Sequence, residues 1–233
     1  MNQVRPILEV IVTSLADALA AEAGGAHRLE LVSRLDLGGL TPSVGLVHEI
    51  TERVRLPVRV MLRETPGFIV TDRAERARLC ALAGEMARLP VDGLVCGFLA
   101  AGGVDEELLA AVLAAAPDLK VTFHRAFEEL PDPLAAMAQL KRHSQIDRLL
   151  TSGGTGQAEA RAGRLAALQR AAAPEIRLLA GGGVDKALIE QLRRAGVVGE
   201  IHVGRLVRSP ARADGWVSAE LVRELIELHF HSH

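Results

Sequence analysis

The chain has 233 residues, of which 49% are hydrophobic, and a formal net charge of −2. This length suits one α/β barrel or two small domains, because barrels of roughly 250 residues commonly form a single domain. The near-balanced charge and the lack of a Lys/Arg-rich run argue against a nucleic-acid-binding protein. No apolar run approaches the roughly 20 residues that a membrane-spanning helix needs, so we expect no membrane partner.

The chain contains two cysteines, Cys80 and Cys96, and they do not form a CxxC pair. This number and spacing exclude a disulfide framework and fit a reducing compartment. The apolar run at residues 7–12 is interrupted by Glu9 and is too short for the core of a signal peptide. We therefore expect a cytoplasmic protein.

Short β-like runs alternate with longer amphipathic stretches along the chain. A strand at 7–12 precedes a helix that opens at Ser14, and a strand at 27–32 precedes a helix after Ser43. The pattern continues in strand–helix pairs: 57–62 with 72 to about 89, 92–97 with 105–115, 119–124 with 132–143, 146–151 with 157–172, and 175–180 with 185–195. The eighth strand is predicted at 199–203, and a helix at 218–228 is predicted as an extra C-terminal element.

Eight strand–helix repeats without a linker predict a single-domain TIM-type (β/α)8 barrel over residues 1–233. An open, doubly wound sheet is the structural alternative.

Several predicted strands carry polar residues at every second position, although strands of parallel sheets are normally apolar on both faces. Side chains alternate between the two faces of a strand, and helices cover the outside of a barrel. The polar set should therefore face the interior and form a paired network, since unpaired buried charges are costly. We expect this network to contain Glu9, Glu30, Arg59, Arg63, His124 and His202.

Position along the strand separates two interpretations of these residues, because barrel active sites form at the C-terminal ends of strands. A functional role is favoured for Arg63, His124, Thr151 and His202, which lie late in their strands. Arg28, Arg59, Lys120 and Glu200 lie early and favour a structural ion network. Both interpretations stay open for Glu9 and Glu30.

Glycine-rich loops follow the last three strands. Glycines allow backbone N–H groups to approach an anion, and barrels often bind phosphate after strands seven and eight. Arg205 could complete such a site as a bidentate partner. The alternative is that the glycines only make tight turns. The residues predicted to bind an anion in these loops are Thr151, Ser152, Gly153, Gly182, Gly183, Gly204 and Arg205.

The sequence resembles the CutC family over nearly its whole length. The motifs that carry the resemblance are Gly24-Gly25-Ala26-His27-Arg28-Leu29-Glu30-Leu31, Gly38-Gly39-Leu40-Thr41-Pro42-Ser43, Val121-Thr122-Phe123-His124-Arg125-Ala126-Phe127 and Gly181-Gly182-Gly183. The resemblance implies a TIM barrel, a cytoplasmic location, a homo-oligomer such as a dimer or tetramer, and a role in copper homeostasis or copper binding.

Two departures from the family pattern affect this implied function. The cysteines suggested as copper ligands in copper-associated members are replaced by Ile11 and Val32. Neither side chain can ligate Cu(I), which prefers thiolate or thioether donors. The family's Arg-Pro-Arg-Gly-Gly-Asp-Phe segment becomes Arg63-Glu64-Thr65-Pro66-Gly67-Phe68, so only the first arginine is kept. We interpret the histidines at 229–233 as a solvated chain end rather than a metal site.

Three functions remain open at this level. The first is an enzyme that acts on a small anionic or phosphorylated metabolite, with Glu9 or Glu30 and His124 as acid and base and Arg63, Arg125 and Arg205 as anion ligands. The second is a copper-binding protein that uses His124, His202 and a glutamate, a donor set suited to Cu(II) or Zn(II). The third is a non-catalytic binding protein whose interior charges are structural.

Overall fold

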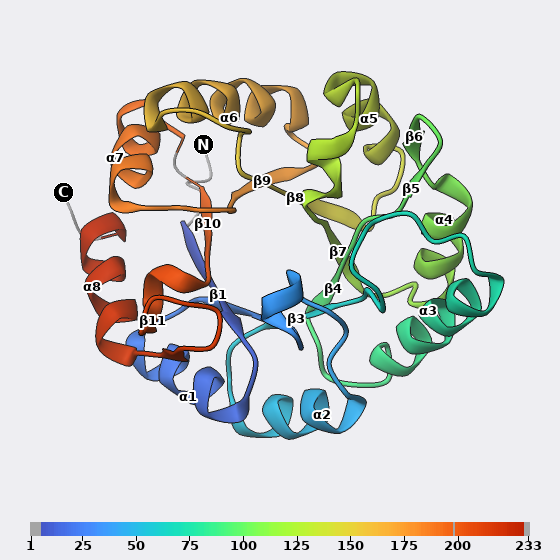
Figure 1. Ribbon diagram of the computed structural model, residues 1–233, viewed down its shortest axis with the longest axis horizontal. Coiled ribbons are helices and arrows are strands. Elements are labelled where there is room, and N and C mark those ends of the chain that lie inside the picture. The colour runs from blue at the N-terminus through green and yellow to red at the C-terminus, as the bar shows by residue number, and fades with distance from the viewer. Residues whose placement is uncertain (1–5, 198, 231–233) are drawn as a thin grey trace.

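A computed structural model describes residues 6–197 and 199–230 of the chain. Its eight main strands pair in parallel in the order β1-β10-β9-β8-β7-β4-β3-β2 and close into a barrel (Figure 1). This confirms the predicted TIM-type barrel and excludes the open sheet. The barrel strands are β1 (Ile7–Val12), β2 (Arg28–Leu31), β3 (Val58–Met61), β4 (Gly93–Cys96), β7 (Lys120–Phe123), β8 (Ile146–Thr151), β9 (Arg177–Ala180) and β10 (Glu200–Val203).

A ring of helices surrounds the strands (Figure 1). The helices are α1 (Leu15–Gly24), α2 (Val44–Arg53), α3 (Arg73–Met86), α4 (Glu106–Ala115), α5 (Pro133–Leu140), α6 (Ala158–Ala172), α7 (Lys186–Arg194) and α8 (Ala219–Phe230). The helix α8, predicted as an extra element, is instead the eighth regular helix, because it follows β10 and lies between α7 and α1 in the ring. Within residues 6–197 and 199–230, no helix is both long and apolar enough to cross a bilayer.

The helices begin where short polar side chains cap them. Ser14 accepts a hydrogen bond from the backbone N–H of Asp17 at 3.1 Å, as expected for an N-cap. Ser43 caps α2, and aspartates cap α3, α4, α5 and α7 in the same way. These local signals explain why most helix starts predicted from the sequence lie within one or two residues of the observed starts.

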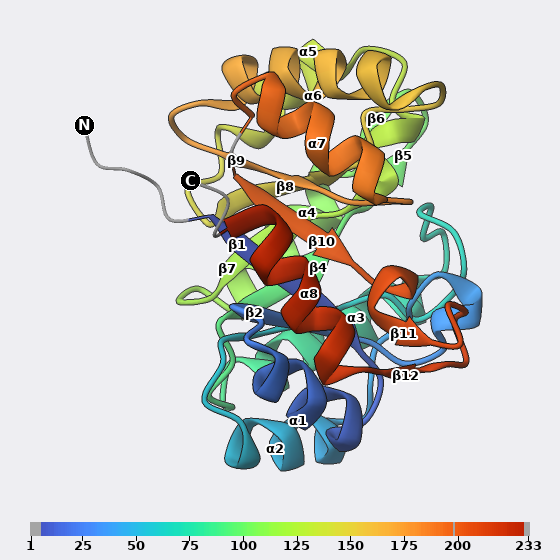
Figure 2. The same cartoon turned by 90° about the vertical axis from the view of Figure 1, so that its left-hand side faces the viewer.

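Small elements that the sequence did not predict shape the end of the barrel at which the strands terminate. Three 3-10 turns follow strand ends: η1 (Leu35–Leu37) after β2, η2 (Arg125–Glu129) after β7 and η3 (Arg205–Val207) after β10. Two hairpins, β5 (Leu99–Ala100) with β6 (Gly103–Val104) and β11 (Arg208–Ser209) with β12 (Trp216–Val217), add to the loops. The β11–β12 hairpin projects from the end of the barrel where β10 ends (Figure 2).

The main hydrophobic core lies between the strands and the helices. Residues such as Leu8, Val10, Leu29 and Val58 are buried there, so the apolar set of each strand faces outward to the helices, as predicted. A separate apolar cluster forms from Val32, Met61 and Val95, with Ile11 and Leu35 packed against it.

An ion network fills the amino-terminal half of the barrel interior. Arg28 donates to the carboxylates of Glu9 and Glu200, the latter at 2.8 Å. Arg148 makes a second contact with Glu200, from its Nη2 to Oε1 at 2.9 Å. Arg59 pairs with Asp147 at 2.7 Å. These charges are nearly all buried and each has a partner, which confirms the structural interpretation of Arg28, Arg59 and Glu200.

Lys120, which was predicted to join this network, is exposed at the amino end of β7 and donates to the backbone oxygen of Ser144 at 3.3 Å. Asp147 and Arg148 were not predicted to join it. A register shift between β7 and β8 falls where these two neighbours lie. Such a bulge breaks the strict alternation of side chains, so both neighbours reach partners inside the barrel.

Candidate functional site

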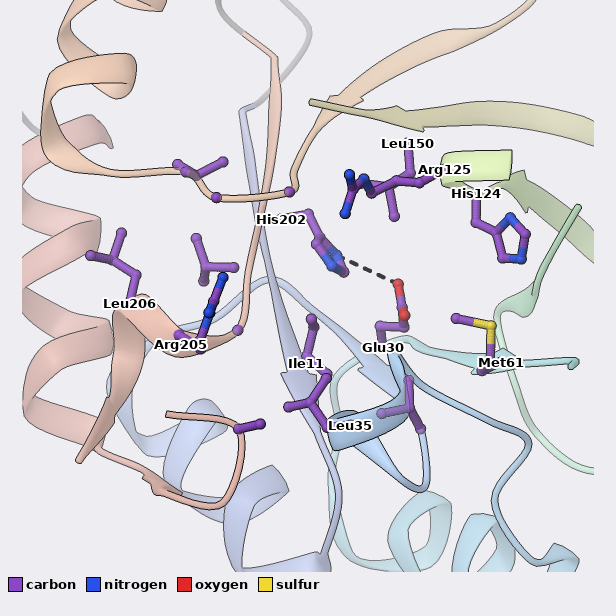
Figure 3. Close-up of a pocket in the computed structure, with 18 of the residues that line it drawn as sticks. Ile11, Glu30, Leu35, Met61, His124, Arg125, Leu150, His202, Arg205 and Leu206 are labelled. Atoms are coloured by element: carbon purple, nitrogen blue, oxygen red, sulfur yellow. Dashed lines mark ion pairs between the residues drawn. The ribbon is translucent and has the colours of Figure 1, made fainter. Parts of the chain in front are cut away.

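A cavity of about 820 Å³ opens at the carboxyl ends of the barrel strands (Figure 3). This is the end at which barrel active sites form, and the volume is in the range of small-molecule sites. Its wall combines titratable groups, arginines and apolar side chains. Of the predicted site residues, the cavity wall contains Glu30, Arg63, His124, Arg125, Gly182, Gly183, His202, Gly204 and Arg205.

Two carboxylates and an imidazole meet at the floor of the cavity. The Nδ1 atom of His202 lies 2.8 Å from Oε1 of Glu9 and 3.5 Å from Oε2 of Glu30. Glu9 is fully buried behind the cavity wall and also accepts from Arg28, so both of its oxygens have partners. Glu30 is buried as well, but its Oε2 atom has no hydrogen-bond donor. Glu30 is therefore the carboxylate of this group that is open to a ligand.

The environments of the two carboxylates move their pKa values in opposite directions. Burial alone would raise the pKa of Glu9, but the positive charge of Arg28 and the hydrogen bond with His202 hold it well below its usual range. Burial raises the pKa of Glu30 to about 7, since its attraction to His202 is offset by repulsion from Glu9. Burial opposes the charged form of His202, but Glu30 and Glu9 together raise its pKa. Glu30 is thus placed to exchange a proton near neutral pH.

A glycine allows His202 to stand at this position. A Cβ atom on Gly181 would lie 2.4 Å from Leu150 Cδ1 and 2.9 Å from His202 Cδ2. Such distances are too short for real atoms, so any larger residue would displace the imidazole. Gly181, the first residue of the predicted glycine loop, therefore serves packing rather than ligand binding.

His124 lies on the other side of the cavity from His202 (Figure 3). It follows the last residue of β7 and caps η2, where its Nδ1 atom accepts the N–H of Ala126 at 3.2 Å. The ring centroid is 5.0 Å from that of Phe68. The prediction that His124 joins the interior ion network is wrong, because the chain leaves the β-ladder at this residue and turns into η2.

Arg63 is also outside the ion network, contrary to the prediction. It lies two residues beyond the end of β3, half-buried, with its guanidinium donating to the backbone oxygens of Leu37 at 2.9 Å and Thr65 at 3.2 Å. Its guanidinium carbon is 5.3 Å from the centroid of Phe68. Burial lowers the pKa of Arg63. Within the described residues no carboxylate forms an ion pair with Arg63, so its charge is available to a ligand in the cavity.

The loop after β10 is held in place by a buried ion pair that the sequence did not reveal. Arg208 donates to Asp17 of α1 at 3.0 Å and to the backbone oxygen of Ile11 at 3.0 Å. This contact joins segments that are almost 200 positions apart, and neither residue belongs to a motif. Arg205, three residues before it, is exposed and lines the cavity, and within residues 6–197 and 199–230 no carboxylate forms an ion pair with it.

The loop after β9 turns its carbonyl groups toward α6. Arg161 donates to the backbone oxygens of Gly182 at 2.9 Å and Gly183 at 3.0 Å. In a trans peptide the following N–H points opposite to the carbonyl. The N–H groups of Gly183 and Val184, two residues of the cavity wall, therefore point away from Arg161. Arg161 is another contributor that the sequence did not indicate.

The predicted anion donors after β8 already bind a carboxylate of the protein itself. Glu128 of η2 accepts hydrogen bonds from Thr151 Oγ1 at 3.1 Å and from the N–H of Ser152, and it pairs with Arg125 at 2.8 Å. Gly153 donates its N–H to Thr151 Oγ1 at 3.2 Å. Thr151, Ser152 and Gly153 consequently lie behind the cavity wall rather than in it.

The donor atoms at this end of the barrel do not suit Cu(I). Ile11 and Val32, at the positions of the suggested cysteine ligands, form an apolar wall with Met61. Cys96 belongs to the outward-facing core, and burial raises the pKa of its thiol to about 12. Among the described residues, Met61 thus supplies the one sulfur atom of the cavity wall, and Cu(I) sites need several soft donors. The proposed set of His124, His202 and a glutamate is not assembled, because the described donors that converge are Glu9, Glu30 and His202.

Fold and site together define a single-domain β/α-barrel protein with a ligand-sized cavity and an acid–base group at its carboxyl-terminal mouth. Residues 6–206 match the model of the CutC family. A CutC protein of Xanthomonas axonopodis pv. citri is 39% identical over 196 residues, which covers 84% of this chain and 81% of that protein. The chain therefore belongs to the CutC family.

Two further relatives extend this comparison. The human copper homeostasis protein cutC homolog is 36% identical over 203 residues, which covers 84% of this chain and 72% of that protein. A solved structure of CutC from Streptococcus agalactiae superimposes with a TM-score of 0.77 at 26% identity, covering 85% of this chain and 97% of that one. The barrel described above is thus the fold of a known family member.

Proposed function

We propose that this chain is an enzyme that binds a small anionic metabolite at the barrel mouth and exchanges a proton with it through Glu30. One observation carries the proposal. Glu30 is buried in the cavity wall with an Oε2 atom that has no hydrogen-bond donor. Arg63 and Arg205 line the same cavity, and neither forms an ion pair with a carboxylate of the described residues. An acid–base group and uncompensated cations facing one space are what an anionic substrate requires.

The cationic groups in the cavity wall support the proposal that the substrate carries an anionic group. Arg63 and Arg205 follow β3 and β10, and the N–H groups of Gly183 and Val184, which precede α7 in the chain, add backbone donors to the same cavity wall. Guanidinium groups and backbone amides together bind carboxylate or phosphate oxygens. Arg125 is a weaker candidate, because its charge is already balanced by Glu128.

The pKa of Glu30 supports the proton transfer. At about 7, it leaves the carboxyl and carboxylate forms both populated at neutral pH, as general acid–base catalysis needs. An anion bound nearby raises this pKa further, because it disfavours the carboxylate. Binding of an anion near pH 7 should therefore be accompanied by proton uptake at Glu30.

Isothermal titration calorimetry with sulfate and with pyruvate, two anions that do not titrate near neutrality, tests this proposal. Titrations at about pH 7 in buffers of different ionisation enthalpy give the number of protons taken up. We expect Arg63→Gln and Arg205→Gln each to weaken binding about tenfold or more, the loss of one charge-assisted contact. We expect Glu30→Gln to abolish the proton uptake.

The matched control is Arg212→Gln, which removes an exposed arginine that pairs with Asp214 in the segment between β11 and β12. It should bind both anions like the wild-type protein. Binding that is insensitive to Arg63→Gln and Arg205→Gln, or no binding of either anion at millimolar concentration, would contradict the proposal.

A copper-binding function is the second candidate, favoured by one observation. Glu9, Glu30 and His202 each place one donor atom within 4.8 Å of the others. These hard donors suit Cu(II) or Zn(II), but Arg28 on Glu9 opposes a second cation at this position. Calorimetry with Cu(I) and Cu(II) on protein truncated after residue 228, with His202→Gln as control, decides the matter. No binding at micromolar metal eliminates copper for this chain.

The homo-oligomeric state and the cytoplasmic location stay predictions drawn from the sequence. Light scattering on the purified full-length chain would test the first of them, with a dimer or tetramer expected and a monomer as the contradicting result.

A further inference from the structure

The protonation of His124 is fixed by its surroundings. A backbone N–H can only donate a hydrogen bond, so the 3.2 Å contact from Ala126 requires Nδ1 to be the unprotonated, accepting nitrogen. Burial and the positive charge of Arg63 lower the pKa of His124 to about 3, so the ring is neutral at physiological pH. The remaining proton of a neutral ring then resides on Nε2.

This Nε2–H donor has no partner. His124 is 3% exposed, and its Nε2 atom is among the buried polar atoms without a hydrogen bond in the described chain. The residue also belongs to the wall of the cavity. A buried donor left without an acceptor is costly, so such a group in a native protein calls for an explanation such as a catalytic role or a bound ligand.

The surrounding residues hold the ring rigidly in this orientation. A Cβ atom on Gly97 would lie 2.5 Å from Nδ1, so a glycine is required behind the ring. Phe68 packs on another side, with a centroid distance of 5.0 Å. Figure 3 shows the His124 ring and the carboxylate of Glu30 on the wall of the same cavity.

We propose that His124 is a neutral, fixed hydrogen-bond donor for a carbonyl oxygen of the substrate, and that Glu30 removes a proton from the carbon next to that carbonyl. This inference rests on the proposed function and names its reaction class. His124 does not serve as the acid or base in this assignment. A neutral imidazole donor paired with a carboxylate base is an established arrangement for such proton abstractions.

The step balances without any further reactant. The Glu30 carboxylate takes the proton, and the electron pair of the broken C–H bond forms a C=C bond to the carbonyl carbon. The C=O electron pair moves onto oxygen, where the Nε2–H of His124 stabilises the enolate charge. The proton then returns from Glu30 to the same carbon or to a neighbouring one. The substrate class is thus a small molecule with a carbonyl group, a C–H bond beside it and an anionic group.

Proton exchange with solvent provides a direct test on the full-length protein. Pyruvate and dihydroxyacetone phosphate are incubated in heavy water, and proton NMR follows the loss of the C–H signal beside the carbonyl. Lactate and glycerol phosphate, which lack the carbonyl, are the matched controls. We expect wild-type protein to exchange at least one of the two carbonyl probes and neither control, and Glu30→Gln to abolish the exchange.

Two variants of His124 separate the donor role from a structural role. His124→Asn keeps an acceptor for the N–H of Ala126 but has no donor near Nε2, so we expect a nearly unchanged melting temperature and exchange slower by about 100-fold, the usual effect of losing one oxyanion donor. His124→Gln places an amide N–H near the Nε2 position and should recover part of the rate. Exchange in His124→Asn at the wild-type rate would overturn the inference.

Nitrogen NMR of the free protein tests the premise independently of any substrate. We expect His124 to show the Nε2–H form without titration between about pH 5 and pH 8. Titration of His124 in that range, or a proton on its Nδ1 atom, would contradict the inference but not the proposed function. The same holds if pyruvate binds with proton uptake at Glu30 but neither carbonyl probe exchanges its C–H bonds. If neither carbonyl probe binds or exchanges but sulfate binds with proton uptake, the inference fails alone. If sulfate does not bind either, the proposed function and the inference both fail.

Discussion

The two halves of the barrel interior carry similar charged residues, but these residues differ in how completely their hydrogen bonds are satisfied. In the amino-terminal half, Arg28, Arg59, Arg148 and Glu200 have a partner for nearly every charge. At the carboxyl-terminal mouth, the Oε2 atom of Glu30 is buried without a hydrogen-bond donor, and its ion-pair partner His202 lies 3.5 Å away. The first half closes the barrel, whereas the second keeps hydrogen-bonding capacity free for a ligand. Satisfied hydrogen bonding, rather than charge or burial, therefore distinguishes structural from functional polar groups in this interior.

Replacing Glu200 should have the largest effect on stability, because it disrupts the ion network in the amino-terminal half of the barrel. Glu200 accepts from Arg28 and Arg148, and Glu200→Gln leaves two buried guanidinium groups without their shared counter-ion. We expect the free energy of unfolding to fall by about 3–5 kcal/mol, the usual result of breaking a buried ion pair. Chemical denaturation measures this change, and Glu190→Gln, which removes an exposed pair with Arg194, is the control that should stay close to wild type.

If Glu200→Gln instead melts like the wild-type protein, the network in the amino-terminal half does not hold the barrel together, and the distinction between the two halves is lost.

Glu30→Gln should change the pH dependence of stability rather than lower stability at every pH. The folded pKa of Glu30, about 7, lies above its ordinary value of 4.5, so the folded state holds this proton more tightly than the unfolded state. The stability from this group is complete below about pH 4.5 and is lost as the pH rises to 7. Since one pKa unit corresponds to 1.36 kcal/mol, the loss amounts to about 3 kcal/mol. Unfolding at pH values across this window should show the decline in wild type and a flatter profile in the variant.

Glu128→Gln sharpens this test because its effect has the opposite sign. Burial alone would raise the pKa of Glu128, but Arg125 and the N–H of Ser152 lower it. Its stabilisation is therefore present above its ordinary pKa of 4.5 and is lost as the pH falls below that value. The variant should be less stable than wild type at neutral pH, and the two should converge in acid. Parallel profiles for the Glu30 and Glu128 variants would contradict the assignment of the two environments.

Arg205→Gln should have the smallest effect on folding. Arg205 is exposed, and no carboxylate in the described part of the chain forms an ion pair with it, so we expect the free energy of unfolding to change by less than about 0.5 kcal/mol. The same variant should lose anion affinity, as described above. A marked drop in melting temperature would mean that Arg205 has a structural role, like the paired charges in the amino-terminal half of the barrel.

The sequence by itself determined the eight-fold strand–helix alternation and the polar faces of the strands, because side-chain direction along a strand has a strict period of two. This was sufficient to place Glu9, Glu30, Arg59 and His202 inside the barrel. Local capping side chains fixed the helix starts for a similar reason, since a cap acts within a few residues of its own position.

Only the tertiary structure decided which inward groups meet and which stay free. The bulge in β8 adds Asp147 and Arg148 to the interior, and η2 carries Glu128 onto the donors at Thr151 and Ser152. The same turn removes His124 from the ion network. Barrel closure and turn geometry depend on segments that are far apart in the chain, so no local pattern records these pairings.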